Sequence, residues 1–236
     1  MTGGASGIGR ALCDILVREG WSVALGDIDA QRAEAAAHAI GAAGFGVDVA
    51  NEASVHAFFN AALDALGGRL DGLATCAGIV DTTAFMDIDV ATFRRVYDVN
   101  VIGTYLCIRE AAKRMLPGGR ICTVASVAGK RGGGLSGTAA YAASKGAVLA
   151  LSRNAARSLA ECGISVNCVA PGPTMTPMLA GPMTLPGQRE RVAATTVLNR
   201  IGEPAEIAEA IAWLLGPKAS FVDGETLTID GGLMMD

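Results

Sequence analysis

Strand-like and helix-like segments alternate along this 236-residue chain, and this alternation restricts the fold more than any other feature of the sequence. The expected strands are short and apolar throughout, as is typical of strands buried on both faces. Such strands, separated by helices, form a parallel sheet with helices on both sides. The sequence therefore predicts an α/β fold with a doubly wound, Rossmann-like sheet in three layers. Because it contains no linker or repeat, we expect a single domain.

The expected elements follow one another without long interruptions. We expect strands at 21–25, 45–49, 70–76, 121–125, 164–169 and 226–229. We expect helices at 5–19, 30–40, 54–66, within 89–116, at 138–161 and at 204–215, with Ser54 as a candidate cap of the third helix. The segment 175–201 is expected to be irregular or loosely helical.

Composition excludes several classes of function. Hydrophobic residues make up 51% and charged residues 18% of the chain, and the net charge is −4, which argues against a nucleic-acid partner. No apolar run approaches the roughly 20 residues of a membrane helix. The N-terminus lacks a signal pattern. We therefore expect a cytoplasmic protein with no membrane partner.

The metal-ligating residue types are scattered. The six cysteines include no C-x-x-C pair, and neither His38 nor His56 lies near a cysteine at ligand spacing. We expect reduced core thiols and no metal site.

A glycine-rich turn, Thr2-Gly-Gly-Ala-Ser-Gly-Ile-Gly9, precedes the first expected helix. Glycines at such a turn let the backbone approach a pyrophosphate, which the start of the next helix stabilises. A glycine run alone is often only a flexible loop. Here Asp27 follows the next strand, eighteen residues after Gly9, where a carboxylate can bind the ribose hydroxyls and repel a 2′-phosphate. The alternative is a solvated turn aspartate.

The position of this turn raises a second expectation. Such a turn normally follows a strand that is central in the sheet, yet only Met1 precedes Thr2. Without that strand, backbone groups on both neighbouring strands would be unpaired. We therefore expect either upstream residues that supply the strand or another segment that fills the gap.

Tyr141 and Lys145 lie four residues apart on an expected helix, so their side chains share one face. A nearby ammonium favours the phenolate, which proton transfer to or from an alcohol oxygen requires. Ser126 ends an expected strand upstream of this pair. Asn100 lies inside an expected helix, where asparagine is unfavourable and a special role is plausible; the alternative is a surface asparagine.

These motifs, in this order, resemble the short-chain dehydrogenase/reductase family from Thr2 to the C-terminal Asp230-Gly-Gly232. The resemblance implies a catalytic set of Asn100, Ser126, Tyr141 and Lys145. It also implies that Tyr141 and Lys145 join a cofactor-binding set made of Gly3, Ser6, Gly7, Ile8, Gly9, Asp27, Asp48, Val49, Ala77, Gly78, Pro171, Gly172, Thr174 and Thr176. In this family the asparagine distorts its helix and supports a proton relay, and the segment corresponding to 175–201 is a substrate lid.

The chain departs from the family pattern at two places. Thr75 and Cys76 stand where the family usually has two asparagines, and Cys76 is expected to be a packing residue rather than a redox thiol. The spacing from Ser126 to Tyr141 is two residues longer than usual, with the extra length expected in the loop 130–137. Ser136 in that loop is an alternative to Ser126.

The sequence thus predicts an NAD-dependent oxidoreductase that transfers hydride between the cofactor and a secondary alcohol or ketone. Asp27, and the absence of Lys or Arg between Gly3 and Ser6, favour NAD over NADP. The alternatives are an NADP-linked 3-oxoacyl-carrier reductase and a non-catalytic nucleotide-sensing scaffold. The resemblance also implies a homo-oligomer, a tetramer or a dimer, formed through the helices near 89–116 and 138–161.

Overall fold

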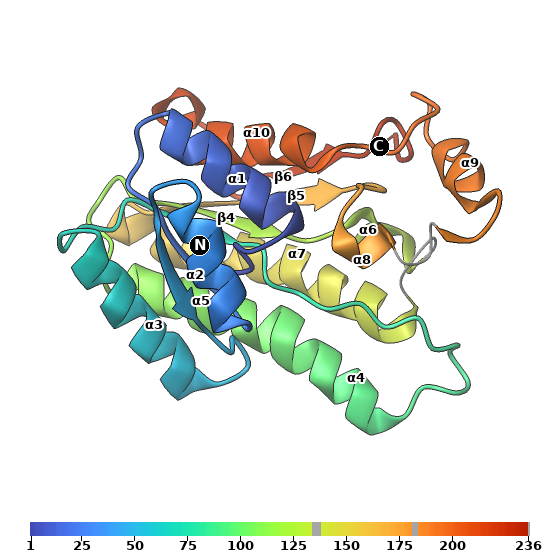
Figure 1. Ribbon diagram of the computed structural model, residues 1–236, viewed down its shortest axis with the longest axis horizontal. Helices are drawn as coiled ribbons and strands as arrows, with labels where there is room; N and C mark the ends of the chain where they lie inside the picture. Colours follow the sequence, from blue (N-terminus) through green and yellow to red (C-terminus); the bar gives the residue numbers. More distant parts are fainter. Residues whose placement is uncertain (134–137, 181–183, 236) are drawn as a thin grey trace.

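A parallel β-sheet forms the centre of the computed structural model, which describes residues 1–133, 138–180 and 184–235 (Figure 1). Every strand pair is parallel, with β1 beside β2 and β3–β6 side by side in chain order. The bounds are β1 Ala24–Asp27, β2 Ala43–Gly46, β3 Gly72–Thr75, β4 Arg120–Val124, β5 Ser165–Pro171 and β6 Thr226–Ile229.

Residues Met1 and Thr2 connect the two groups of strands. Thr2 forms parallel bridges to Gly26 of β1 and to Thr75 of β3. Its backbone nitrogen donates to Ala74 O at 3.1 Å, and the backbone nitrogen of Gly26 donates to Met1 O at 2.8 Å. The first two residues therefore lie between β1 and β3, at the centre of the sheet.

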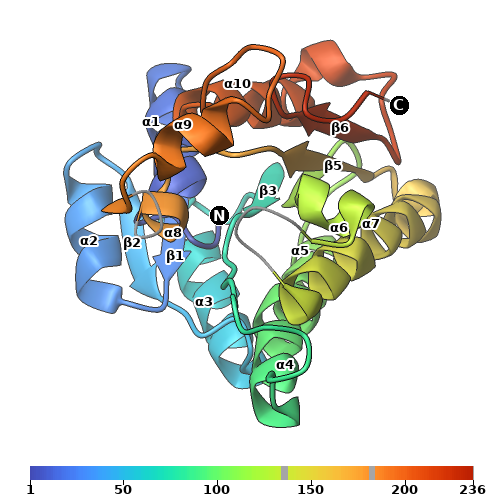
Figure 2. The ribbon, with the colours of Figure 1, turned by 90° about the vertical axis from the view of Figure 1, so that its right-hand side faces the viewer.

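Helices cover both faces of the sheet, as Figure 2 shows, with α1 and α10 on one side and α3, α5 and α7 on the other. The bounds are α1 Gly7–Arg18, α2 Ala30–His38, α3 Glu52–Ala65, α4 Val90–Tyr97, α5 Gly103–Ala112, α6 Val127–Arg131, α7 Ala139–Leu159, α8 Pro177–Ala180, α9 Gln188–Ala193 and α10 Pro204–Leu215. This arrangement confirms the predicted doubly wound α/β fold.

A separate hydrophobic core lies on each face of the sheet. On one side, Leu12 and Leu16 of α1 pack with Ile207 and Ile211 of α10, all buried. On the other side, the core contains apolar residues of α3, α5 and α7, among them Phe58, Phe59, Leu106, Cys107 and Ala155. Both cores hold the strand ends, and therefore the loops that follow them, in fixed positions.

The structure corrects several of the predicted elements. The strands expected at 21–25 and 45–49 lie at 24–27 and 43–46 instead. The helix expected within 89–116 is interrupted by a π-helix, η1 (Asp98–Ile102), between α4 and α5. Helix α3 is capped by Asn51, whose side chain accepts from Ser54 N at 3.0 Å, so the prediction of Ser54 as the cap was wrong. Helix α6, directly after Ser126, was not predicted.

Candidate active site

A cavity of about 860 Å³ opens at the carboxyl ends of the strands. Its walls come from the glycine turn and from the loops that follow β1, β3, β4 and β5. In a doubly wound sheet this edge is where ligands bind. The predicted site residues that line it are Gly3, Ser6, Gly7, Ile8, Gly9, Asp27, Asp48, Val49, Ala77, Gly78, Ser126, Tyr141, Lys145, Pro171, Gly172, Thr174 and Thr176.

The glycine turn is packed too closely to accept side chains. A Cβ on Gly3 would lie 2.5 Å from Ala77 N, and one on Gly9 would lie 2.1 Å from Gly3 O. Gly3 and Gly7 also have positive φ angles of 68° and 54°. These glycines bring the backbone close to the β3 loop and leave a smooth wall, which suits the close approach of a pyrophosphate.

Helix α1 begins at this turn with its first amides free of side-chain caps. Ser6, the N-cap residue, makes no capping hydrogen bond, and the first turn of the helix has no acidic residue. The positive end of the helix dipole therefore faces the cavity, as a phosphate-binding helix requires. The residues present fit a dinucleotide.

Asp27 ends β1 beside this turn. Its Oδ2 accepts a hydrogen bond from Ala5 N at 3.2 Å, which ties the carboxylate to the glycine turn. Asp48 and Val49, which follow β2, line the same part of the cavity. Two carboxylates, those of Asp27 and Asp48, therefore border this part of the cavity.

Tyr141 and Lys145 come from one face of α7 and meet Ser126 from the end of β4. The Lys145 Nζ lies 5.8 Å from the centre of the Tyr141 ring and donates to Val124 O at 2.8 Å. The Ser126 hydroxyl also interacts with the Tyr141 phenol and lowers its pKa, which opposes the effect of burial. Ser126 caps α6, since its Oγ accepts from Ala128 N at 3.1 Å. The three predicted side chains are therefore assembled in one place.

Burial controls the protonation of this group. It raises the pKa of Tyr141, an effect that the hydrogen bond from Ser126 partly opposes. It lowers the pKa of Lys145 to about 8, since the ammonium has lost its water. Desolvation of the phenol is the largest effect on the Tyr141 pKa in the folded chain, and the expectation that Lys145 lowers this pKa stays a prediction.

Asn100 lies within the π-helix η1, in contact with Ile79 and with Ser144. Its side chain accepts from Ile79 N at 2.8 Å and donates to Ile79 O at 2.9 Å and to Ser144 Oγ at 3.0 Å. It is fully buried and does not line the cavity. The π-helix therefore connects the loop that follows β3, through Ile79, to Ser144 of α7, the residue before Lys145. The alternative of a surface asparagine is wrong.

The loop after β5 closes the cavity from the opposite side. Thr174 Oγ1 donates to Gly172 O at 3.0 Å, and a Cβ added to Gly7 would lie 3.2 Å from Thr176 Cγ2. The following segment places Met178 and Leu179 in the cavity wall. Part of the predicted lid, 181–183, and the alternative serine, Ser136, lie outside the described residues.

The cavity wall also contains residues that no motif predicted. Arg94 and Arg95 of α4 and Arg131 of α6 line it, together with Ile28 and Val80. Arg131 is the last residue of α6, which begins directly after Ser126. Because this helix was not predicted, the sequence gave no sign that Arg131 lies in the cavity wall. Cys76 also lines the cavity, and burial raises the pKa of its thiol to about 12, as expected of a packing cysteine rather than a reactive one.

This site and fold define a dinucleotide-binding oxidoreductase, and the comparisons with known proteins agree. A family profile described as enoyl-(acyl carrier protein) reductase matches residues 3–234. The cis-4-hydroxycyclohexanecarboxylate dehydrogenase of Sinomonas cyclohexanicum is 40% identical over 98% of this chain and 94% of its own length. The 2-(S)-hydroxypropyl-CoM dehydrogenase 3 of Xanthobacter autotrophicus is 38% identical over 99% of this chain and 94% of its own length.

A solved structure, the short-chain dehydrogenase/reductase SDR:glucose/ribitol dehydrogenase from Brucella melitensis, superimposes with a TM-score of 0.92. It is 33% identical and covers 100% of this chain and 95% of its own. The chain belongs to the short-chain dehydrogenase/reductase family. Among the described residues, no helix is both long and apolar enough to span a membrane.

Proposed function

We propose that this protein is an NAD-dependent dehydrogenase that interconverts a secondary alcohol and the corresponding ketone. The observation that carries the proposal is that Ser126, Tyr141 and Lys145 line the same cavity as the glycine turn. Within this cavity, Lys145 and Ser126 both lie close to Tyr141. Bound NAD would supply the hydride acceptor for alcohol oxidation. A nucleotide-sensing scaffold would need no tyrosine beside a buried lysine.

Each side chain has a separate part in this proposal. Tyr141 takes the hydroxyl proton of the alcohol, and Ser126 donates a hydrogen bond to the same substrate oxygen. Lys145 holds positive charge beside the phenol and binds the ribose of the cofactor. Asn100 is a positioning residue, because it acts through Ile79 and Ser144 rather than on the substrate.

Removing the phenol oxygen tests this assignment. Tyr141→Phe should lower kcat by about a thousandfold or more, since general acid–base catalysis contributes roughly 10²–10⁴-fold, while the Kd for NAD changes little. Tyr105→Phe, on the exposed part of α5, is the matched control and should leave kcat unchanged. If Tyr141→Phe retains more than about a tenth of the wild-type turnover, another group moves the proton.

Cofactor choice rests on Asp27. Its carboxylate, tied to Ala5 N, would repel a 2′-phosphate, and we propose at least about a tenfold preference for NAD in kcat/KM, or about 1.4 kcal/mol. Asp27→Ser should remove most of this preference. Asp29→Ser, which keeps the cap of α2, is the control. Equal use of NAD and NADP by the wild-type protein would favour the carrier-protein reductase alternative.

The substrate we propose is a cyclic or short secondary alcohol that carries an anionic group. Arg131 brings a positive charge into the cavity from the helix that follows Ser126. One relative is named for a hydroxycyclohexanecarboxylate. Turnover of cis-4-hydroxycyclohexanecarboxylate should exceed that of the uncharged 4-methylcyclohexanol, and Arg131→Gln should reduce this difference without lowering activity on the uncharged alcohol. Equal turnover of both alcohols would refute the anionic preference.

We also propose that the protein is a homo-oligomer. Ile102 of η1 and Tyr105 of α5 are exposed, at 44% and 43%, on the helices expected to pair between subunits. Burial of such side chains would stabilise a closed assembly. A monomeric mass by light scattering at micromolar concentration would contradict this.

A further inference from the structure

Ser144 of α7 is fully buried, and its hydroxyl makes two hydrogen bonds beside the active-site cavity. The hydroxyl accepts from Asn100 Nδ2 at 3.0 Å and donates to Tyr141 O at 2.7 Å. The first bond reaches the π-helix η1, and the second reaches the backbone of the residue that carries the phenol. The serine therefore connects Asn100 to Tyr141 through a single oxygen atom.

The carbonyl group of Tyr141 can accept the bond from Ser144 in addition to its helical bond. Within an α-helix, this oxygen accepts from the amide of Lys145, four residues further on. Because a carbonyl oxygen has two lone pairs, the Ser144 hydroxyl adds a second bond without displacing the first. Bonds from serine hydroxyls to carbonyls one turn earlier often bend a helix. This bond acts on the turn that holds Tyr141, and so it influences where the phenol lies.

Asn100 is itself held in place by the loop that follows β3. Its Oδ1 accepts from Ile79 N at 2.8 Å, and its Nδ2 donates to Ile79 O at 2.9 Å. Its backbone is held as well, since Thr104 Oγ1 donates to Asn100 O at 2.8 Å. The amide group of Asn100 cannot rotate without breaking these contacts to Ile79. Ser144 therefore accepts its hydrogen bond from a donor whose position is fixed.

The loop after β3 is attached to the start of α7 at a second point. Thr138, the N-cap residue of α7, donates to Asp81 O from its backbone nitrogen at 3.2 Å and from its Oγ1 at 3.3 Å. The Asp81 carboxylate accepts from Thr83 N and Thr83 Oγ1, both at 3.1 Å, which stiffens the loop. Thr138 precedes Tyr141 in the chain, and Ser144 follows it. The turn that carries the phenol is thus attached to this loop before and after Tyr141.

The same loop also borders the reacting groups. Gly78 and Ile79 line the active-site cavity together with Tyr141 and Lys145. A Cβ added to Gly78 would lie 3.5 Å from Lys145 Nζ and 3.2 Å from Asn100 Oδ1. A displacement of α7 relative to the loop would therefore change the geometry of the site. Such changes matter, because a misplacement of about 1 Å can lower a rate about a hundredfold.

We propose that Ser144 is a positioning residue, which holds Tyr141 in its reactive position by joining the Tyr141 carbonyl group to Asn100 and to the loop after β3. Ser144 is fully buried and does not line the cavity, so it acts only through these partners. The inference rests on the proposed function, in which Tyr141 moves the substrate proton.

Ser144→Ala tests this role because it removes both hydrogen bonds and keeps a residue that favours the helix. The kcat of alcohol oxidation should fall about tenfold to a hundredfold, while KM and the Kd for NAD change less than about twofold. A loss confined to kcat is expected because Ser144 contacts neither ligand. An unchanged kcat would overturn the proposal.

Ser152→Ala is the matched control on the same helix. Ser152 is 2% exposed, its Oγ donates to Val148 O at 2.7 Å, and it shares a hydrogen bond of 2.6 Å with Thr123 Oγ1 of β4. The control thus loses the same kinds of contact, but at a position outside the cavity wall. Its Tm should fall about as far as that of Ser144→Ala, with kcat within about twofold of wild type. Similar losses of kcat in both variants would reveal a general effect of helix stability and would overturn the proposal.

Tyr141→Phe, measured in the same assay, separates this inference from the proposed function. If Tyr141→Phe loses turnover and Ser144→Ala does not, only the role of Ser144 is refuted. If Tyr141→Phe remains active, the proposed function is wrong, and hydrogen exchange then decides whether Ser144 holds the turn of Tyr141. The amides of Ile79 and Lys145 should exchange at least about tenfold faster in Ser144→Ala than in Ser152→Ala. Equal exchange at both amides in the two variants would refute the proposal in either case.

Discussion

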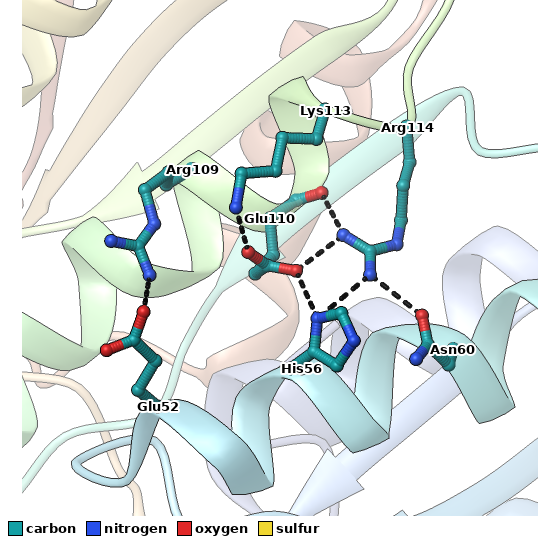
Figure 3. Close-up of polar contacts among 7 residues, drawn as sticks. All are labelled: Glu52, His56, Asn60, Arg109, Glu110, Lys113 and Arg114. Atoms are coloured by element: carbon teal, nitrogen blue, oxygen red, sulfur yellow. Dashed lines mark hydrogen bonds and ion pairs between the residues drawn. The ribbon is translucent and has the colours of Figure 1, made fainter.

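Replacement of Glu110 by glutamine should destabilise the protein strongly, although this residue lies outside the active-site cavity. Figure 3 shows its carboxylate between α5 and α3, enclosed by basic side chains. Oε1 accepts from Lys113 Nζ at 2.6 Å, and Oε2 accepts from Arg114 Nη1 at 2.6 Å and lies 3.0 Å from His56 Nδ1. The side chains of Glu110 and Arg114 are only 4% and 12% exposed, so water screens the contact between these two residues only weakly.

The size of the effect follows from the protonation of this carboxyl group. Burial alone would raise its pKa, but the hydrogen bonds from Lys113, Arg114 and His56 outweigh burial and lower the pKa from 4.5 to about 2. At about 1.36 kcal/mol per pKa unit, the ionised form contributes about 3 kcal/mol at neutral pH. Glutamine also leaves Arg114 without its carboxylate partner, so we expect a loss of about 2–3 kcal/mol at pH 7.

The pH dependence identifies the cause. Because the pKa of Glu110 is lowered in the folded state, its contribution is complete above the unfolded value of 4.5 and is lost as the pH falls toward about 2. Urea unfolding should therefore show a difference between wild type and Glu110→Gln that is constant above pH 5.5 or so and about half as large at pH 3.

Glu52→Gln is the matched control, since Glu52 also joins α3 to α5 through Arg109 but is 69% exposed. It should cost no more than about 1 kcal/mol. If the two variants lose equal stability, or if the Glu110→Gln difference does not change between pH 7 and pH 3, the buried carboxylate does not stabilise the fold as we argue.

Three further predictions concern the active-site cavity. Gly9→Ala should weaken NAD binding at least about tenfold in calorimetry, because its Cβ would lie 2.1 Å from Gly3 O; unchanged affinity would contradict the close packing. The stability of wild type relative to Lys145→Met should rise between pH 8 and 10.5, because the unfolded lysine binds its proton more tightly than the buried one; parallel stability curves would refute this. Asn100→Ala should cost about 2–4 kcal/mol in urea unfolding, because both backbone groups of Ile79 lose their partner, and a loss below about 0.5 kcal/mol would contradict that role.

The order of strands and helices could be predicted because each element has its own pattern of apolar residues. The first and last residues of each element were harder to predict, because they depend on single hydrogen bonds. Asn51 and Ser54 are both good capping residues, and the sequence does not show which accepts and which donates. The π-helix at 98–102 adds one residue to a turn of an otherwise α-helical segment. Its only signal in the sequence was the unfavourable placement of Asn100.

The residues of the candidate site also fall into two groups: those that the sequence predicted and those that only the structure revealed. Residues in motifs were predicted because backbone geometry restricts them, as the packing of Gly3 against Ala77 shows. Arg94, Arg95 and Arg131 were missed, because they reach the cavity from two separate helices and belong to no motif. The substrate that we propose rests on such a residue, Arg131, and so the sequence predicted a reaction class but no particular substrate.

The tyrosine pKa shows what residue spacing cannot determine. Positions 141 and 145 share a helix face, and this led to the expectation that the ammonium would lower the pKa of the phenol. In the folded chain, however, Lys145 Nζ donates to Val124 O and lies 5.8 Å from the ring centre, while burial raises the pKa of Tyr141. The same burial lowers the pKa of Lys145 to about 8, which still leaves the lysine mostly protonated at neutral pH. The positive charge of the nicotinamide ring of bound NAD would favour ionisation of the same phenol. It follows that the alkaline rise of the alcohol oxidation rate should occur at a lower pH than the titration of Tyr141 in the protein without NAD, and ultraviolet difference spectra of the phenolate would measure that separation.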